Sequence, residues 1–178
     1  MASGILPFPA DIDRVAFGYW LSGFVDGEGC FFLGTYPGKR VFALARFSIR
    51  LRLDDAPILR LIQSYLSCGI LRPYRGIQRD PCRRNSRPQM NFVVHSVDDL
   101  LTNIAPHFHQ FPLRAKKALD FPVWLRGVQL MQGIKGRPIR GFGNGGGTYP
   151  RWTAAERFAF TDLVLELKNV RAFVDPIE

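Results

Sequence analysis

Apolar residues recur at helical spacing near the start of the chain, between residues 15 and 25. Asp13 stands just before this pattern, and aspartate is one of the residue types that cap helix N-termini. Two glycines then interrupt the pattern, and an aromatic run typical of a strand follows directly. The pattern predicts a helix that begins near Arg14 and ends in Asp26-Gly27-Glu28-Gly29, at the edge of a sheet.

The end of this predicted helix carries two acids. The helix dipole disfavours negative charge at a C-terminus by about 0.3–1 kcal/mol, so Asp26 and Glu28 call for a cationic partner, and a divalent metal is the obvious candidate. Gly18, Ser22 and Gly23 leave one helix face without bulky side chains, where a second backbone could approach. An ordinary amphipathic helix with a glycine cap would show the same pattern, and this alternative stays open.

A period of two dominates the next segment. From Val41 to Leu53 the odd positions are apolar, whereas the even positions from 46 onward are Arg46, Ser48, Arg50 and Arg52. Alternation places these four side chains on one face of a strand. A solvated sheet face usually mixes both signs of charge, whereas this face has only positive charge. We therefore predict a face that contacts phosphates or bases.

Turn signals and apolar spacing predict the remaining elements. They are a helix after Pro57 that ends at Gly69, a hairpin with strands near 70–75 and 90–95, a helix near 100–104 cut at Pro106, and a helix from 113 towards 131 with a bend at Pro122. Thr153-x-x-Glu156 is a capping box for a last helix, about 153–173, after a Gly-rich linker at 141–147. The order is αββαββα with helices at the C-terminus, which predicts an α+β fold in one domain, 1–178, with its core at about 14–131.

The positive charge of the chain is concentrated in its middle. The 178 residues carry a formal net charge of +9, and all of this excess lies between Gly38 and Phe92, with twelve basic and three acidic residues. This asymmetry predicts a polyanionic partner for the middle segment. The loop from 76 to 88 is rich in arginine, and a merely solvated charged loop is its alternative interpretation.

The cysteines and histidines do not form a recognisable metal or disulfide pattern. The three cysteines, Cys30, Cys68 and Cys82, are widely spaced, so we expect reduced thiols in an intracellular protein. His107 and His109 are two residues apart, which does not place them on one helix face. No secretory signal is visible, and the apolar stretch before Asp26 is too short to span a bilayer.

The nine residues Leu21-Ser22-Gly23-Phe24-Val25-Asp26-Gly27-Glu28-Gly29 resemble the signature of the single-motif LAGLIDADG homing endonucleases. Five positions depart mildly from the eponymous string, and Glu28 keeps the carboxylate of its second Asp. Further segments are similar to later landmarks of that family: Phe47 to Asp55, Leu61-Ile62, Cys68-Gly69, Phe92-Val93-Val94, Phe111-Pro112-Leu113 and Lys116-Lys117. The resemblance implies four antiparallel strands that form a saddle across the DNA major groove, with two motif helices packed at its centre.

The resemblance also implies an activity and an assembly. A chain with one motif is expected to act as a homodimer that cuts double-stranded DNA at a long, roughly palindromic site, using Mg²⁺, for which Ca²⁺ or Mn²⁺ can substitute, and to be intron-encoded. The helix face expected at the dimer interface comprises Gly18, Leu21, Ser22 and Val25. The metal ligands would be the Glu28 carboxylate and the Gly27 carbonyl, whereas Asp26 would brace the helix end.

The remaining site residues follow from the same resemblance. Glu28, Arg52 and His95 are the residues expected to be catalytic. Leu51 stands where family members often have a polar residue, and His95-Ser96 where they often have a lysine, so Arg50, Arg52 or His95 must substitute, or turnover is slow. Arginine suits bidentate contacts with guanine and Lys or Arg suits phosphates. The residues expected to bind DNA are Gly34, Tyr36, Lys39, Arg40, Arg46, Ser48, Arg50, Arg72, Tyr74, Arg75, Arg79, Arg83, Arg84, Arg87, Lys116 and Lys117.

Two alternatives to a nuclease remain. The Leu51 departure mildly favours a relative that keeps the fold without the chemistry, such as an RNA-splicing maturase or a DNA-binding regulator. A basic structural RNA-binding protein is the other alternative, and it would need neither a metal nor a two-fold symmetric site.

Overall fold

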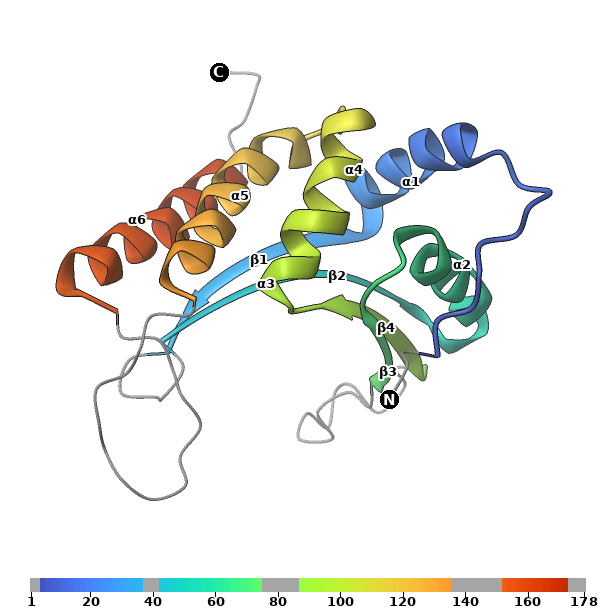
Figure 1. Cartoon of the computed structure of the whole chain (residues 1–178), viewed down its shortest axis with the longest axis horizontal. Coiled ribbons are helices and arrows are strands. Elements are labelled where there is room, and N and C mark those ends of the chain that lie inside the picture. Colours follow the sequence, from blue (N-terminus) through green and yellow to red (C-terminus); the bar gives the residue numbers. More distant parts are fainter. Residues whose placement is uncertain (1–3, 37–41, 75–86, 136–151, 173–178) are drawn as a thin grey trace.

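The computed structural model describes residues 4–36, 42–74, 87–135 and 152–172 (Figure 1). Its strands are β1 (Gly29–Thr35), β2 (Ala43–Arg52), β3 (Ile70–Tyr74) and β4 (Gln89–Val94). Its helices are α1 (Arg14–Glu28), the short turn η1 (Leu53–Asp55), α2 (Ala56–Leu66), α3 (Val97–Asp99), the π-helical turn η3 (Leu100–Ile104), α4 (Ala105–Gln110), α5 (Lys117–Ile134) and α6 (Ala154–Arg171).

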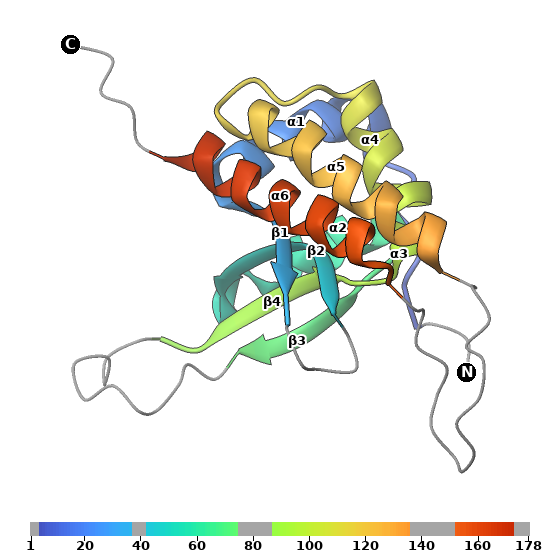
Figure 2. The same cartoon turned by 90° about the vertical axis from the view of Figure 1, so that its left-hand side faces the viewer.

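The strands form one antiparallel sheet in the order β1-β2-β4-β3. The long strands β1 and β2 curve strongly, and α1, α4, α5 and α6 lie together over one face of the sheet (Figures 1 and 2). The other face is not covered by any helix of the described residues. The α+β fold with a four-stranded antiparallel sheet is thus confirmed.

The core lies between the curved sheet and these helices. Its largest fully buried side chains include Trp124 of α5 and Phe31, Phe47 and Phe92 of three neighbouring strands. Phe31 links the two layers, because its ring lies 5.0 Å from Trp124 and 5.3 Å from Phe47, centroid to centroid. Burial of such aromatic side chains supplies most of the driving force for packing helices on a sheet.

The ends of α1 and α6 follow the signals in the sequence. The Asp13 carboxylate accepts hydrogen bonds from the Val15 and Ala16 N–H groups, at 2.7 and 3.1 Å. Thr153 and Glu156 form the reciprocal contacts of a capping box at the start of α6. The Gly-rich tract at 141–147 lies outside the described residues.

Two helix boundaries differ from the sequence prediction. Pro106 does not cut the helix near residue 104, because it stands in the first turn of α4, where its missing N–H costs nothing. The helix expected from residue 113 begins at Lys117 instead. The backbone N–H groups of Arg114 and Ala115 bond to a side chain of α1 rather than to a helix of their own.

The described residues contain no helix with the length and hydropathy needed to cross a membrane.

Candidate nucleic-acid interface and active site

The uncovered sheet face gathers arginines from several strands. Arg46, Ser48, Arg50 and Arg52 alternate along β2 with buried apolar residues, as the period of two predicts. Arg50 lies opposite Asn91 of β4, which in turn lies opposite Arg72 of β3. The register therefore builds a polar, positively charged row across the sheet.

Aromatic rings hold two of these arginines. The Arg50 guanidinium lies 3.8 Å from the centre of the Tyr74 ring, and the Arg46 guanidinium lies 4.7 Å from that of Phe32. Cation–π contacts of this kind are worth about 0.5–1 kcal/mol at exposed sites and limit the rotamers of a long side chain. The face thus presents partly ordered guanidinium groups rather than freely moving ones.

The rest of the predicted DNA-contacting set is placed unevenly. Gly34 lies on β1 opposite Leu44, Tyr36 is exposed just after β1, and Ser48 is nearly buried between neighbouring strands. Lys39, Arg40, Arg75, Arg79, Arg83 and Arg84 fall outside the described residues.

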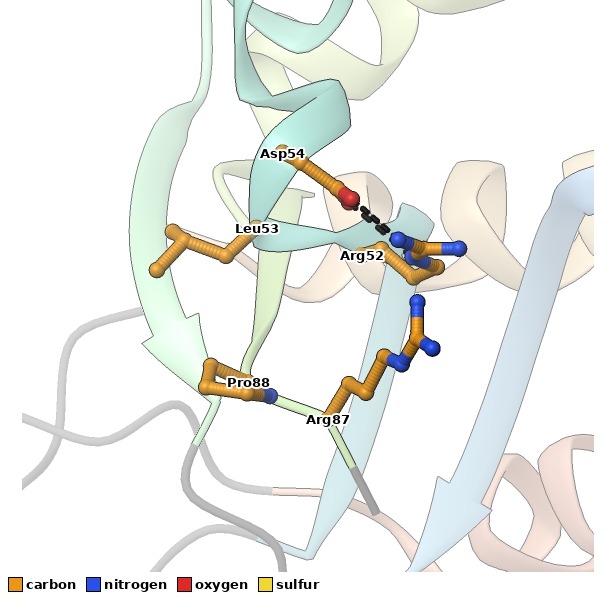
Figure 3. A pocket seen from close by; sticks show the side chains of 5 residues that line it. All are labelled: Arg52, Leu53, Asp54, Arg87 and Pro88. Atoms are coloured by element: carbon orange, nitrogen blue, oxygen red, sulfur yellow. Dashed lines mark hydrogen bonds and ion pairs between the residues drawn. The ribbon is translucent and has the colours of Figure 1, made fainter.

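Arg52 and Arg87 line a pocket of about 440 Å³ beside η1 (Figure 3). The Arg52 guanidinium is paired with Asp54, and its Nε donates to Oδ1 at 3.0 Å. Hydrogen bonding to Arg52 lowers the pKa of Asp54. The charge of Arg87 lowers the pKa of Asp54 further, so the pocket holds two guanidinium groups against one carboxylate and keeps an excess of positive charge that suits a phosphate.

His95 lies among cations at the end of β4. Burial lowers the pKa of this histidine, and the nearby charges of Arg72 and Arg46 lower it further. Val94 pairs with Phe47, so His95 lies at the level of Arg46 along β2. Gly29 pairs with Ile49, so Glu28, the residue before it, lies at the level of Arg50.

His95 therefore does not meet Glu28 within one chain, whereas Arg52 is only two residues along β2 from the level of Glu28 but is paired with Asp54. Glu28 and His95 are separated by roughly four residues, or about 13 Å, along the strand direction. Within the described residues, no hydrogen bond or ion pair joins Glu28 to His95 or Arg52.

The end of α1 is fixed by contacts from the segment that leads into α5. Asp26 Oδ2 accepts hydrogen bonds from the N–H groups of Arg114 and Ala115, at 2.8 and 3.1 Å. The Asp26 side chain therefore joins α1 to that segment. Glu28, the last residue of α1, is exposed, and none of the described residues is bonded to its carboxylate.

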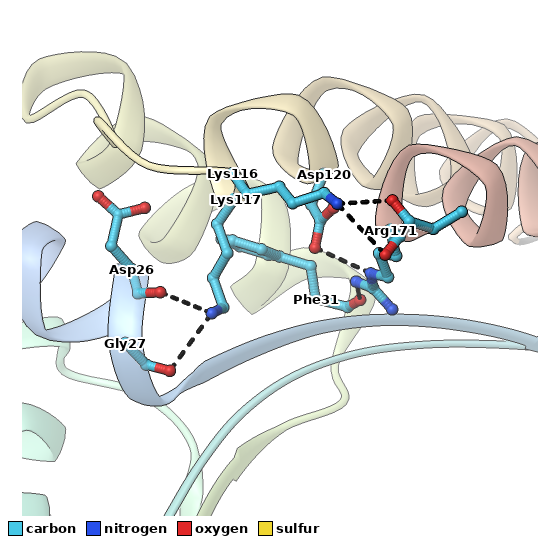
Figure 4. A network of polar contacts seen from close by, with 8 residues as sticks. Asp26, Gly27, Phe31, Lys116, Lys117, Asp120 and Arg171 are labelled. Atoms are coloured by element: carbon cyan, nitrogen blue, oxygen red, sulfur yellow. Dashed lines mark hydrogen bonds and ion pairs between the residues drawn. The ribbon is translucent and has the colours of Figure 1, made fainter. Parts of the chain in front are cut away.

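Two adjacent lysines cap the C-termini of two helices (Figure 4). Lys117 Nζ donates to the carbonyl oxygens of Asp26, at 2.7 Å, and of Gly27, at 3.4 Å. Lys116 Nζ donates in the other direction, to the carbonyl oxygens of Ala172 and Arg171 at the end of α6, at 2.7 and 3.4 Å. The last turn of α1 has no basic residue of its own, so Lys117 supplies the cation that its dipole favours.

These contacts add roles that sequence reasoning missed. Both lysines were expected to bind DNA, but the structure engages both ammonium groups with carbonyl oxygens of the chain itself. The cation that the sequence suggests beside Asp26 and Glu28 is a divalent metal. The structure places the Lys117 ammonium, 91 residues away from Asp26 in the sequence, on the Asp26 and Gly27 carbonyl oxygens rather than on either carboxylate. The acids at the end of α1 signalled a cation but not which one.

The oxygen atoms at the end of α1 suit a hard divalent cation. The Gly27 carbonyl and the exposed Glu28 carboxylate are oxygen donors, which Mg²⁺ prefers, usually with one or two carboxylates, waters and substrate phosphates. The described residues contain no cluster of three or more His, Cys, Asp or Glu side chains around a common point. The donor set thus fits a site that water, phosphate or a second chain completes.

The predicted dimer face needs correction. Gly18, Leu21, Ser22 and Val25 are buried within the chain itself, and they cannot meet a second subunit. A Cβ on Gly18 would lie 2.6 Å from the Phe111 ring, so the small residues there admit a neighbouring segment of the same chain.

The opposite face of α1 is the bare one. A Cβ on Gly23 or Gly27 would meet no atom within 4 Å, and the two glycines are one helical turn apart. The exposed aromatic residues Tyr19 and Trp20 flank Gly23. Tight backbone approach is therefore possible on this side of the helix.

A buried polar pair holds the inner face of α1. The Ser22 hydroxyl donates to the Phe111 carbonyl oxygen at 2.6 Å, and Ser22 Oγ lies 3.3 Å from His107 Nε2. Because the hydroxyl proton is used on Phe111, the imidazole is left to donate. Burial lowers the pKa of His107 to about 4, so it is neutral at physiological pH.

The fold and site define a class: a basic α+β protein with an open, arginine-bearing sheet face and an oxygen-donor site at the end of one helix. The family model described as LAGLIDADG endonuclease matches residues 21–127, which is more than half of the chain. The chain belongs to the LAGLIDADG endonuclease family.

Curated relatives match part of the chain. A probable intron-encoded endonuclease 2 of Neurospora crassa is 29% identical over 104 residues, 58% of this chain and 20% of that protein. An uncharacterised 50.9 kDa protein in ND4 intron 1 of Podospora anserina is 27% identical over 120 residues, 64% of this chain and 24% of that protein. The aligned part thus spans a quarter or less of these relatives' own length.

Solved structures share the fold. I-TnaI, a homing endonuclease, has a TM-score of 0.62 at 20% identity, covering 90% of this chain and 96% of that one. I-SmaMI bound to cleaved DNA has a TM-score of 0.62 at 23% identity, covering 87% of this chain but 45% of that one. The same unit therefore matches nearly all of one chain and about half of another.

Proposed function

We propose that this chain is a site-specific, double-stranded DNA endonuclease that acts as a homodimer on a long, roughly palindromic target with Mg²⁺. The observation that carries the proposal is the meeting of three features at the end of α1. The bare helix face with Gly23 and Gly27 leads directly to the exposed Glu28 carboxylate, and the arginine-bearing sheet face begins at the next residue.

The uncovered sheet face would carry recognition. Arg50 and Arg72 stand in one row on either side of Asn91, with strand β4 between them, and their guanidinium groups can reach base edges in a major groove. Arg52 and Arg87 lie at the end of that face, where their pocket suits a backbone phosphate. I-SmaMI, a protein with the same fold, has been solved bound to cleaved DNA, which supports DNA as the partner.

The outer face of α1 would carry assembly. One chain has a single α1, and the bare face lacks a packing partner within the described residues. A second copy would meet it through Gly23 and Gly27 and bring a second Glu28 close to the first. Two carboxylates related by a two-fold axis would address the two strands of a duplex, one each.

The chemistry would depend on oxygen donors at the helix end. The Gly27 carbonyl and the Glu28 carboxylate would hold Mg²⁺, which when bound would stabilise the negative charge that develops at the phosphorus and on the leaving oxygen. Asp26 holds the helix end in place through Arg114 and Ala115, so that the Glu28 backbone is fixed relative to the sheet. Glu28 itself remains exposed and available.

A pool of randomised duplexes tests this function. The wild type and Glu28→Gln are incubated with the pool and Mg²⁺, and released ends and bound duplexes are both sequenced. We expect wild-type cleavage at one long, roughly palindromic site, and binding without cleavage for Glu28→Gln. Glu166→Gln, which removes an exposed carboxylate of α6 that is paired with Arg126, is the matched control and should cut like the wild type.

A non-cutting nucleic-acid-binding relative is the second candidate. Leu51 packs against the core, so it offers no polar group near the end of β2, and neither His95 nor Arg52 is oriented towards Glu28 by any described contact. Selective enrichment of bound duplexes or of folded intron RNA, with no cuts by the wild type, would favour this candidate and contradict the nuclease.

A further inference from the structure

Lys117 occupies the oxygen that a divalent metal would need. Its ammonium group lies 3.4 Å from the Gly27 carbonyl oxygen and 2.7 Å from that of Asp26. The proposed function assigns the same Gly27 oxygen to the metal. A divalent cation bound to the Gly27 oxygen would lie close to the Lys117 ammonium and repel it strongly, so the two cations cannot use that oxygen at once.

Asp120 offers the ammonium a second position. It follows Lys117 by three residues in α5, which puts the two side chains on one side of that helix. Both line a pocket of about 310 Å³, which also contains Gly29 and Arg171. Lys117 can therefore turn between the end of α1 and Asp120 without leaving the pocket.

One oxygen of Asp120 lacks a donor. The residue is only 5% exposed, and Oδ2 accepts a hydrogen bond from Arg171 Nε at 2.8 Å. Oδ1 is buried and has no hydrogen-bond partner in the described part of the chain. A buried carboxylate oxygen without a donor is costly, and an ammonium group would satisfy it.

The neighbouring cations are held elsewhere. Lys116 donates to the Ala172 and Arg171 carbonyl oxygens, and the Arg171 guanidinium already bridges Asp120 and the Phe31 carbonyl oxygen of β1 (Figure 4). Among the basic residues that line this pocket, Lys117 is thus the one that donates to a proposed metal ligand, the Gly27 carbonyl oxygen.

We propose that Lys117 and the divalent metal exchange places at the end of α1: the ammonium caps the helix in the metal-free chain and moves to Asp120 when the metal takes the Gly27 oxygen. This inference rests on the proposed function for the position of the metal. Asp120 is then a positioning residue, because it acts on the site only through Lys117.

The test measures metal affinity rather than cleavage. Full-length chain labelled with ¹³C at lysine Cε is titrated with Ca²⁺, and the Lys117 resonance and an apparent Kd are followed by NMR. Lys117→Met removes the competing cation and should tighten binding at least about fivefold, the lower end of usual couplings between bound groups. Lys116→Met makes the same charge change one residue away and should leave the affinity unchanged.

Two variants of one ion pair separate the exchange from a general loss of structure. Asp120→Asn removes the second position of Lys117 and should weaken Ca²⁺ binding. Arg171→Met breaks the same pair but leaves the carboxylate in need of a cation, so it should attract Lys117 and tighten binding. Structural damage alone would shift both affinities in the same direction, and that result would overturn the exchange.

Glu28→Gln separates this inference from the proposed function. Ca²⁺ binding that Glu28→Gln abolishes, together with opposite shifts in the two ion-pair variants, supports both. Binding that Glu28→Gln abolishes but Lys117→Met leaves unchanged or weaker overturns the exchange alone. Binding that is insensitive to Glu28→Gln places the metal elsewhere and overturns the metal role of both.

Discussion

Both faces of α1 carry a pair of small residues at helical spacing, but the surroundings of the two pairs differ. Gly18 and Ser22 on the inner face are four residues apart, and so are Gly23 and Gly27 on the outer face. A Cβ on Gly18 would lie 2.6 Å from the Phe111 ring, whereas one on Gly23 would meet nothing within 4 Å. Small residues at helical spacing show that a backbone can approach, but not whether it belongs to the same chain.

The largest expected effect concerns the buried histidine on the inner face. The folded pKa of His107 is about 4, below the ordinary value of 6.5, so the unfolded chain binds more protons between these two values. The stability contribution is complete above pH 6.5 and is lost as the pH falls towards 4. At pH 4 this loss amounts to about 3 kcal/mol of unfolding free energy.

Chemical denaturation across this pH range checks the prediction. Between pH 6.5 and 4, the unfolding free energy of His107→Gln should fall by about 3 kcal/mol less than that of the wild type. His109→Gln, an exposed histidine two residues further on, should keep the wild-type slope. Equal slopes in the wild type and His107→Gln would show that the inner face does not depend on a neutral imidazole.

The next largest effect separates the faces by one methyl group. Gly18→Ala forces a Cβ against the Phe111 ring, which is itself buried between Tyr19 and His107, and should cost about 2 kcal/mol. Gly23→Ala adds the same methyl in open space and should stabilise the isolated chain by about 0.5–1 kcal/mol through helix propensity. Thermal unfolding at low protein concentration measures both, and losses of similar size would erase the distinction.

The sequence predicted the helices and strands better than it predicted how they pack against one another. Asp13, the Thr153 capping box and the alternation along β2 are local signals, and each produced the element that it predicted. The prediction that Pro106 ends a helix was wrong. A proline disrupts a helix beyond its first turn, but η3 leads directly into α4, and Pro106 stands in the first turn of α4. Such a choice depends on packing around Leu100 and Ile104, which are fully buried.

The candidate site was predictable where it depends on one segment. The acids at the end of α1 predicted a cation, for which a divalent metal was the candidate, and the structure places the Lys117 ammonium on carbonyl oxygens of the same helix end. Asp120 follows Lys117 at a spacing that the sequence displays. The partner of Asp120, Arg171, is 51 residues away, and Lys117 reaches Asp26 across 91 residues. Those contacts arise from the docking of α6 and α5 beside β1, which no local pattern encodes.

A last effect tests the outer face directly. If two copies meet through Gly23 and Gly27, the methyl of Gly23→Ala separates the helices and should weaken self-association by about tenfold, or roughly 1.4 kcal/mol. Sedimentation equilibrium measures the dimer constant, with Gly133→Ala as control, because a Cβ there also meets nothing within 4 Å but on α5. The same substitution at residue 23 would then give a more stable monomer and a weaker dimer, a combination that an interface elsewhere on the chain would not produce. A wild-type chain that stays monomeric at all concentrations, with and without DNA, would contradict the homodimer and leave the outer face of α1 to another partner.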